Sequence, residues 1–336
     1  MRLPALICTD LHLTANPRDE YRWGLWSWLR KTCEKEAVQT LLILGDVTDA
    51  KDYHPAELIN RIVREIDLTR ACVPEIIILQ GNHDYLRLGH PALGFVSALQ
   101  GVRFVSKPMD TSAEGEAALF LPHTKTPLKD WAGFDWSMYR YVFMHQTVDG
   151  SIASNGQRMD GDQFPDMTSA GKIYSGDIHV PQVINGVEYV GSPYHVHFGD
   201  SFKSRCVLLN AGGEAFDLRF RSISRVTLDV GTLDLGQICQ MHRLRAGDQV
   251  KLRLHLGASE LHEWHAIKRA AVEEMKTAGV ELFGVELVPP KQRRRFNESA
   301  LPQGAVFLRP QDLVYNFVER EELGADALDI GLELLE

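Results

Sequence analysis

The sequence has few cysteines and no long apolar run. Its five cysteines include no Cys-x-x-Cys pair and stand mostly in apolar surroundings, as Cys8 and Cys72 do, which argues against a disulfide framework or a zinc ribbon. A reducing compartment is therefore expected. No apolar stretch approaches the roughly 18 to 20 residues of a membrane span, and the apolar run before Asp10 is too short for a signal peptide. We expect a cytoplasmic protein without a membrane segment.

Basic charge is also scarce. Among the 336 residues, 45 acidic side chains outnumber 36 basic ones, so the formal net charge is -9. That balance argues against a surface that coats nucleic acid through general positive charge. It leaves open a phosphate-handling site whose positive charge comes from bound metal, because a count of residues omits the ion. The composition, 44% hydrophobic and 24% charged, is that of a globular protein with a substantial core.

Strands alternate with helical stretches through the first half of the chain. Helical spacing of apolar residues predicts helices over 20–37 and after Pro55. Continuous apolar runs favour buried, parallel strands early in the chain, and Asn185-Gly186 and Gly212-Gly213 predict later antiparallel hairpins. The fold class is therefore an α/β sandwich. Its predicted early strands cover 3–9, 40–46, 117–122, 140–146 and 172–179, and a further buried strand within 75–84 runs into a Gly-Asn loop.

The order of elements changes near residue 222. We predict a main α/β domain over 1–222 and a small α+β capping domain over 223–290, with strands at 249–257 and 280–290 and a helix from Ser259 to about Thr277. A basic linker over 291–310 includes the run "KQRRRF" (291–296). Residues 311–336 are predicted to form two acidic amphipathic helices that are split near Gly324.

Polar residues stand where the strands of the first 180 residues end. Such positions line the crevice in which α/β sheets bind ligands. Residues at i and i+2 of an extended segment point to the same side, so each Asp-x-His pair is expected to face one point if strand geometry persists. The set comprises Asp10, His12, Asp46, Asn82, His83, Asp84, His145, Asp177 and His179.

The types of these side chains indicate a metal site. Carboxylates, imidazoles and an amide without cysteine suit manganese, iron(II) or magnesium better than structural zinc. Seven of the residues are too many ligands for one ion and enough for two if one carboxylate bridges. Two ions roughly 3.5 to 4 Å apart activate a water and stabilise a leaving oxygen in phosphoryl transfer.

The motifs "DLH", "GDVTD", "GNHD", "MHQ" and "GDIH", in this order and at strand ends, resemble those of the calcineurin-like metallophosphoesterases. That resemblance covers about Asp10 to Asp200 and implies a β-sandwich flanked by helices. "GSPYHVHFGD" (191–200), the appended domain and the tail resemble the SbcD nuclease subunit, the bacterial and phage counterpart of the meiotic-recombination-eleven nucleases.

The resemblance implies a role for each matching residue. Asp46 would bridge two divalent ions, manganese before magnesium. Asp10, His12 and His179 would complete the first site, and Asn82, His145 and Asp177 the second. His83 would contact the scissile phosphodiester and assist the leaving oxygen, oriented by Asp84.

Asp177 departs from the pattern of the family, which usually has histidine there. As a ligand, Asp177 would make the second site harder, so that it favours Mn or Mg over Zn. Alternatively, it only orients His179.

Several other residues have both a functional and an ordinary interpretation. His195 and His197 could touch DNA or metal but are expected to shape a loop or support ligands. His54 could meet a phosphate, although a surface position is favoured. "HEWH" (262–265) lacks the i, i+4 spacing of zinc-binding helices and is expected to be exposed. Trp23, Trp26 and Trp28 could stack on bases, but packing against the sheet is favoured; 291–296 is as compatible with phosphate steering as with a solvated linker.

The resemblance implies a DNA nuclease of an end-processing complex used in DNA repair, recombination or replication. It would act as an exonuclease on duplex ends and an endonuclease on single strands. It would form a homodimer and dock its tail on an SbcC-type ATPase. Two alternatives are a phosphatase or cyclic-nucleotide phosphodiesterase on the same fold, and a non-catalytic protein that binds DNA ends.

Overall fold

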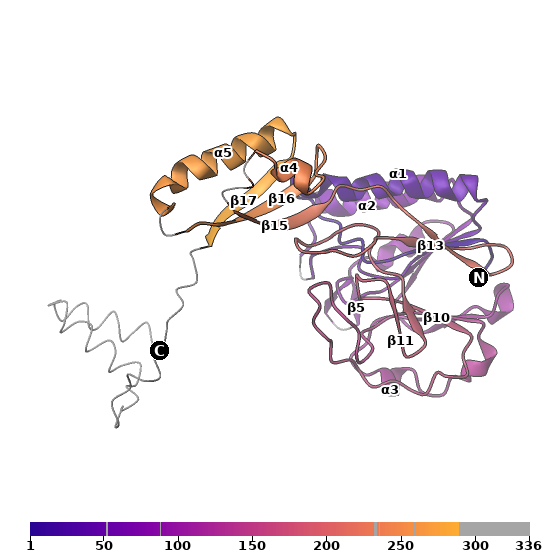
Figure 1. Cartoon of the computed structure of the whole chain (residues 1–336). Coiled ribbons are helices and arrows are strands. Elements are labelled where there is room, and N and C mark those ends of the chain that lie inside the picture. The colour runs from indigo at the N-terminus through magenta and orange to yellow at the C-terminus, as the bar shows by residue number, and fades with distance from the viewer. Residues whose placement is uncertain (52, 88, 232–233, 235, 258–259, 289–336) are drawn as a thin grey trace, which may run out of the picture. The chain divides into compact units, whose positions relative to one another are not determined.

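A computed structural model gives the structure of residues 1–288, except for residues 52, 88, 232–233, 235 and 258–259 (Figure 1). The basic linker and the tail helices predicted over 291–336 lie outside the described residues. Residues 1–289 form one compact unit, and the boundaries predicted at residues 222, 290 and 310 stay predictions. None of the helices in the described part of the chain has the length and hydrophobicity that crossing a bilayer requires.

The first sheet has six strands in the order β14-β13-β1-β2-β3-β6. β1, β2, β3 and β6 run parallel, whereas β13 and β14 are antiparallel additions. The buried apolar runs of the sequence therefore form the parallel centre of the sheet, as predicted. The bounds are β1 (Ala5–Cys8), β2 (Thr40–Ile43), β3 (Glu75–Leu79), β6 (Val102–Val105), β13 (Cys206–Leu209) and β14 (Ala215–Leu218).

The second sheet has the order β11-β12-β10-β9-β8-β7. Its four inner strands are parallel, and β7 and β11 pair antiparallel at its edges. Asn185 and Gly186, with φ of 50° and 81°, form the predicted two-residue turn between β11 and β12. The bounds are β7 (Met109–Asp110), β8 (Ala118–Leu121), β9 (Tyr141–His145), β10 (Lys172–Gly176), β11 (Gln182–Ile184) and β12 (Val187–Tyr189).

The two sheets pack face to face and share a buried core. Ile7 and Leu42 of the first sheet and Phe143 and Tyr174 of the second belong to this core. Helices α1 (Glu20–Lys35) and α2 (Ala56–Thr69) cover the outer face of the first sheet, and the short α3 (Pro127–Asp130) and its neighbouring loops cover the second. The predicted α/β sandwich flanked by helices is confirmed.

The three tryptophans of α1 pack against the first sheet, the interpretation that the sequence favoured. Trp23 and Trp26 are buried in the core between α1 and the first sheet, and Trp28 packs against its edge. Burying such rings is worth more to the fold than leaving them free to stack on bases. A base-stacking platform on α1 is therefore not present.

The cap is a three-stranded parallel sheet, β15-β16-β17, covered by α5. Two of its strands were predicted; the first was missed because exposed polar residues interrupt its apolar pattern. α5 begins after a 3₁₀ turn (Leu261–Glu263), several residues later than predicted, and Ser259 lies outside the described residues. The bounds are β15 (Arg225–Gly231), α4 (Ile238–Met241), β16 (Gln249–His255), α5 (Trp264–Thr277) and β17 (Glu281–Val288).

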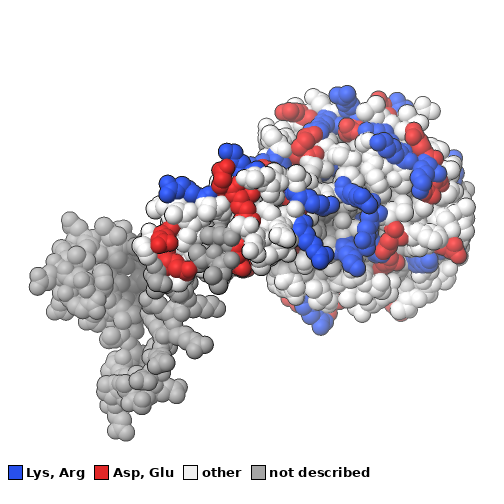
Figure 2. Space-filling model, turned by 45° about the horizontal axis from the view of Figure 1, so that its top comes forward, with Lys and Arg blue, Asp and Glu red and all other residues white. Residues whose placement is uncertain are grey.

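The remaining elements are short connections. β4 (Tyr85–Arg87) and β5 (His90–Pro91) form a separate hairpin after β3. The other 3₁₀ turns cover Pro17–Asp19, Gly94–Ala98, Ser112–Glu114 and Trp136–Met138. Over the visible surface, acidic and basic side chains are interspersed, and one group of Lys and Arg side chains surrounds a hollow (Figure 2).

Candidate metal centre

The predicted polar residues follow five strands whose carboxyl ends meet at one edge of the sandwich. Three of these strands are parallel neighbours in the first sheet and two are parallel neighbours in the second. The sequence signal at strand ends therefore corresponds to one location in space. Asp10 and His12 follow β1, Asp46 follows β2, Asn82, His83 and Asp84 follow β3, His145 ends β9, and Asp177 and His179 follow β10.

The Asp-x-His pairs do not continue their strands, so the condition on which the i, i+2 argument depended is not met. β1 ends at Cys8 and β10 at Gly176, and Asp10, His12, Asp46 and Asp177 have φ of 53°, 43°, 51° and 81°. These left-handed conformations cost a non-glycine residue roughly 1 to 3 kcal/mol each. Contacts between loops compensate: the amides of Asp10 and His12 donate to the carbonyls of Gly45 and Asp46 at 3.1 and 2.9 Å.

Two glycines allow the loops to approach this closely. A Cβ atom at Gly45 would collide with Nδ1 of His145, and one at Gly81 would collide with the carboxylate of Asp46. Gly45 also has a φ of 90°, which side chains disfavour. The glycines of "GDVTD" and "GNHD" are thus required by the packing of the site itself.

One half of the cluster gathers three residues from β1 and β10. Asp10, His12 and His179 each offer one ligand atom, and these atoms lie within 4.8 Å of one another. Nε2 of His12 is 3.0 Å from Nε2 of His179. Two ring nitrogens that face each other at this distance can both bind one cation.

The other half is centred on Asp46 and His145. Nε2 of His145 lies 3.4 Å from Oδ1 of Asp46 and 3.8 Å from Oδ1 of Asp177. The amide Nδ2 of Asn82 donates to Oδ1 of Asp177 at 3.3 Å. Because Oδ2 of Asp46 lies 3.7 Å from Nε2 of His12, the two oxygens of Asp46 face different halves. Asp46 is therefore placed to bridge two ions.

The hydrogen bonds of Asp177 favour the ligand interpretation over the orienting one. Its carboxylate accepts from Asn82 and from the hydroxyl of Thr147. Within the described residues, no hydrogen bond joins it to His179. Direct ligation by Asp177 stays a prediction.

The donor atoms of the cluster fit bound cations. Oδ2 of Asp10, Oδ1 of Asn82 and Nε2 of His145 are buried and have no hydrogen-bond partner among the described residues. Such orphaned acceptors are costly unless something else satisfies them. Nδ1 of His145 lies 2.6 Å from the carbonyl oxygen of Leu44, an acceptor, so Nδ1 donates there and Nε2 is the ring nitrogen that would face a cation.

Burial and repulsion between neighbouring carboxylates also disfavour the ionised form of these side chains when no cation is bound. Burial, opposed in part by His145, raises the pKa of Asp10 to about 7. Burial and the charge of Asp46 raise the pKa of Asp84 to about 6. Burial with the neighbouring His12 lowers the pKa of His179 to about 2, so its ring is neutral. Divalent cations bind carboxylates in the anionic form and imidazoles in the neutral form, so confining these side chains together favours a bound cation.

His83 and Asp84 act at different places. Nε2 of His83 lies 3.9 Å from Oδ2 of Asp46, while its Nδ1 faces the carbonyl oxygen of Asp49 at 2.6 Å. The carboxylate of Asp84 accepts instead from the amides of Val47 and Gly81 at 3.0 and 2.9 Å. Asp84 thus holds together the loops after β2 and β3, rather than the ring of His83 as predicted, because its buried oxygens need backbone donors.

Three further side chains near the cluster were missed by sequence reasoning. Oδ1 of Asp49 lies 3.3 Å from Nδ1 of His12. The ring of His123 lies edge-on to that of His145 at 6.4 Å, and burial lowers the pKa of His123 to about 4. Thr147 donates to Asp177. Asp49 and Thr147 stand within three residues of predicted ligands, and His123 directly follows the strand predicted over 117–122, so the sequence contained a signal for all three.

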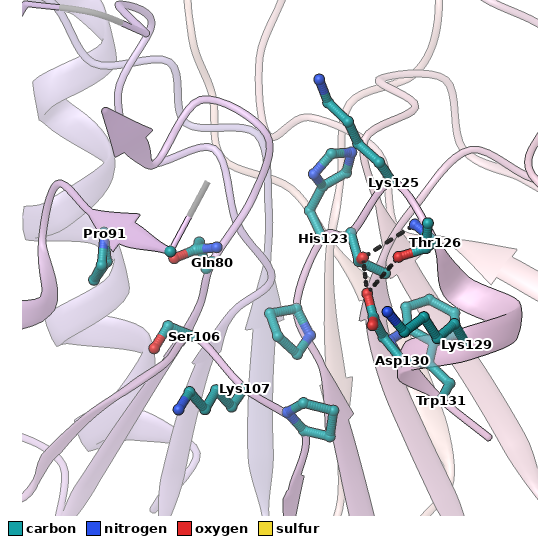
Figure 3. Close-up of a pocket in the computed structure, with 14 residues that line it drawn as sticks. Gln80, Pro91, Ser106, Lys107, His123, Lys125, Thr126, Lys129, Asp130 and Trp131 are labelled. Atoms are coloured by element: carbon teal, nitrogen blue, oxygen red, sulfur yellow. Dashed lines mark hydrogen bonds between the residues drawn. The ribbon is translucent and has the colours of Figure 1, made fainter. Parts of the chain in front are cut away.

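Two cavities flank the cluster. The larger, of about 540 Å³, has Gln80, Ser106 and Lys107 on one side and His123, Lys125 and Lys129 on the other (Figure 3). The three lysines form no ion pair with the residues that the structure describes. The second cavity, of about 390 Å³, is lined by Asp177, His179 and His197.

Four other histidines match their ordinary interpretations. His197 stacks on His179 at 5.4 Å, and Nε2 of His195 faces the carbonyl oxygen of Phe202 at 3.0 Å, so one supports a predicted ligand and the other shapes a loop. His54 is half-buried rather than at the surface as predicted, and its Nε2 lies 2.8 Å from the hydroxyl of Thr48. His262 and His265 are exposed, as predicted.

A family model described as calcineurin-like phosphoesterase matches residues 3–185, which include all nine of the predicted site residues. The chain belongs to the calcineurin-like phosphoesterase family. Family membership assigns it to the phosphoester hydrolases that use divalent metal ions. Among curated proteins, no sequence matches significantly. Of the solved structures, nuclease MPE of Pseudomonas putida is 15% identical over 64% of this chain and 87% of its own, with a TM-score of 0.30.

Removal of divalent metal is expected to destabilise this phosphoesterase. A ligand at 100 times its dissociation constant stabilises the native state by about 2.7 kcal/mol, which corresponds to a Tm shift of about 4 °C for a chain of this size. Differential scanning calorimetry with EDTA and with Mn²⁺ measures the shift. Ca²⁺ at the same ionic strength is the control, and equal Tm values in EDTA and Mn²⁺ would contradict the assignment.

Proposed function

We propose that the chain hydrolyses phosphodiester bonds of DNA with two divalent ions held by Asp10, His12, Asp46, Asn82, His145, Asp177 and His179. The observation that carries this proposal is a cluster of carboxylate and imidazole ligands beside a lysine-lined cavity. Ligands from five segments satisfy the chemistry of phosphoester hydrolysis. The unpaired lysines add a place for the neighbouring phosphates of a polymer.

Different residues of the chain would have different roles in the reaction. Bound divalent ions would lower the pKa of water and neutralise charge on the phosphate. Asp46 would fix their separation with its two oxygens. The carbonyl of Asp49 accepts from Nδ1 of His83, so Nε2 would donate to the phosphate, or give a proton to the departing sugar oxygen, from the doubly protonated ring.

Two features of the cavities favour a strand over a small ester. His123 belongs to the wall of the lysine cavity and also contacts the ring of His145, so the cavity continues from the ligand cluster. Asp177 and His179 line the second cavity. A strand that enters one cavity and leaves by the other would place one phosphodiester over the ions.

The finer assignment follows the sequence resemblance. We propose an SbcD-type subunit, of bacterial or phage origin, that prefers manganese and acts in the cytoplasm. It would cut duplex ends as an exonuclease and single strands as an endonuclease. It would form a homodimer and bind an SbcC-type ATPase through residues 311–336, which lie outside the described residues.

The function is tested by comparing substrates. Full-length protein with Mn²⁺ is incubated with linear duplex DNA, a single-stranded oligonucleotide and bis(p-nitrophenyl) phosphate. Cleavage of DNA and of the diester supports the proposal. Hydrolysis of p-nitrophenyl esters without DNA cleavage would favour a phosphatase or cyclic-nucleotide phosphodiesterase, and hydrolysis of no substrate would favour a non-catalytic DNA-end binding protein.

Substitution of the cavity lysines is expected to weaken the binding of a DNA strand without changing the hydrolysis of a small ester. In the double variant Lys107→Ala/Lys125→Ala, KM for the oligonucleotide at low salt should be higher than in the wild type. The slope of log affinity against log salt concentration should decrease in magnitude by about 0.7 for each lost phosphate contact. Hydrolysis of bis(p-nitrophenyl) phosphate should be unchanged, because it has no flanking phosphate. Lys31→Ala, an exposed lysine on α1, is the matched control. An unchanged salt slope in the double variant would contradict a role for the cavity in binding DNA.

A further inference from the structure

A third cavity lies apart from the ligand cluster, where the main sandwich meets the cap. Its volume is about 550 Å³, and its walls include Arg219, Arg221, Arg245, His195 and Ser222. It shares no lining residue with the two cavities at the metal centre. The segment 194–198 runs between them, because His195 lines this cavity and His197 lines the one at His179.

The arginines of this cavity are not engaged with carboxylates as surface arginines usually are. Arg219 and Arg221 are exposed and form no ion pair within the part of the chain that the structure describes. Arg245 makes only a long contact, 4.0 Å from Nε to Oδ2 of Asp248, and donates to the carbonyl of Ser222 at 3.5 Å. Guanidinium groups that line one cavity, two of them with no carboxylate partner among the described residues, are suited to bind an oxyanion in bidentate fashion.

Two buried polar atoms of the same cavity lack partners. Nδ1 of His195 and Oγ of Ser222 are shielded from solvent and have no hydrogen-bond partner among the described residues. A buried group left in this way costs free energy unless a ligand or water satisfies it. The cavity is therefore lined by arginines with little carboxylate pairing and by two residues that each have an unsatisfied polar atom.

The tautomer of the His195 ring indicates which class of anion the cavity would bind. Its Nε2 faces the carbonyl oxygen of Phe202 at 3.0 Å, and a carbonyl only accepts, so Nε2 carries the proton. In the neutral ring, Nδ1 is then an acceptor, which needs a hydroxyl group on the ligand. A phosphate monoester or inorganic phosphate has a P–OH group in its monoanionic form, whereas a phosphodiester has none.

We propose that this cavity is a binding site for a phosphate monoester group, either inorganic phosphate or the terminal phosphate of a nucleotide. Arg219 and Arg221 grip the phosphate oxygens, the hydroxyl of Ser222 donates to one of them, and Nδ1 of His195 accepts from the P–OH. The half-buried ring of Phe220, which also lines the cavity, provides an apolar surface beside the phosphate. The site is independent of the reaction at the metal centre.

Isothermal titration calorimetry on the full-length protein in EDTA tests the site, because chelation removes phosphate binding that depends on metal. Inorganic phosphate, deoxyadenosine 5′-monophosphate and dimethyl phosphate are titrated at constant ionic strength. We expect phosphate or the nucleotide to bind with a dissociation constant of about 1 mM or tighter, and dimethyl phosphate at least about tenfold more weakly. Tighter binding of the nucleotide would identify it as the natural source; equal binding would identify inorganic phosphate.

Variants assign the binding to the cavity. Arg219→Ala/Arg221→Ala should weaken phosphate binding at least about tenfold, and Ser222→Ala should weaken it less. Arg64→Ala, an exposed arginine on α2, should leave it unchanged, and the circular dichroism of all variants should match the wild type. No binding in EDTA, equal affinity in the double arginine variant, or equal affinity for dimethyl phosphate would each overturn the proposal.

Discussion

An Asp46→Asn variant is expected to lose both metal binding and hydrolysis. Asp46 presents its two oxygens to imidazoles from three other segments: Oδ1 to His145, and Oδ2 to His12 and His83, at 3.4 to 3.9 Å. An amide offers one neutral oxygen in place of two charged ones, so it cannot bridge two cations. Because bound ions contribute several kcal/mol to phosphoryl transfer, hydrolysis of bis(p-nitrophenyl) phosphate should fall about a thousandfold or more.

Metal analysis distinguishes this loss from misfolding. Inductively coupled plasma mass spectrometry should find two Mn per wild-type chain and fewer than one per Asp46→Asn chain. The substitution preserves shape and can still accept from the amide of His83, a bond of 2.9 Å in the wild type, so circular dichroism should be unchanged. Asp149→Asn, at an exposed carboxylate that pairs with Arg158, is the control. Two ions in Asp46→Asn would refute its bridging role.

A His83→Asn variant is expected to retain metal and lose rate. Nε2 of His83 lies at the edge of the cluster, and its ring is oriented by the backbone of Asp49 rather than by a ligand. If His83 assists the departing oxygen, its removal should lower kcat by about 10² to 10⁴, the range for a general acid or base. KM and the number of bound ions should be unchanged.

The metal content decides between two roles for His83. His83, His12 and Asp46 also have ligand atoms within 4.8 Å of one another, so they could themselves hold an ion. Loss of one Mn in His83→Asn would therefore assign His83 to the metal rather than to the substrate. His54→Asn is the matched control, because among the described residues the ring of His54 hydrogen-bonds to Thr48 and not to a member of the cluster, and the kcat of this variant should remain near the wild-type value.

The location of the site was predictable because two signals coincide at the strand ends of this sequence: an apolar run stops, and a polar residue follows it. Apolar runs such as 40–44 and 75–79 are long enough to identify buried strands, and a polar residue at the end of a parallel strand has only the crevice at the edge of the sheet to occupy. The roles of Asp84 and His123 were not predictable in this way. Both depend on which backbone amides and rings come from other segments, and spacing along the chain contains no such information.

By itself, the sequence determined the buried strands that precede the cluster, the hairpin turns and the identity of the side chains at the cluster, because hydrophobic period and turn chemistry are local properties. Only the tertiary structure decided how those side chains converge. The strands stop before Asp10 and Asp177, and hydrogen bonds between separate loops hold left-handed backbone that an isolated segment would not adopt. The close approach of five segments, with glycine where a Cβ would collide, is a property of the packed sandwich rather than of any single motif.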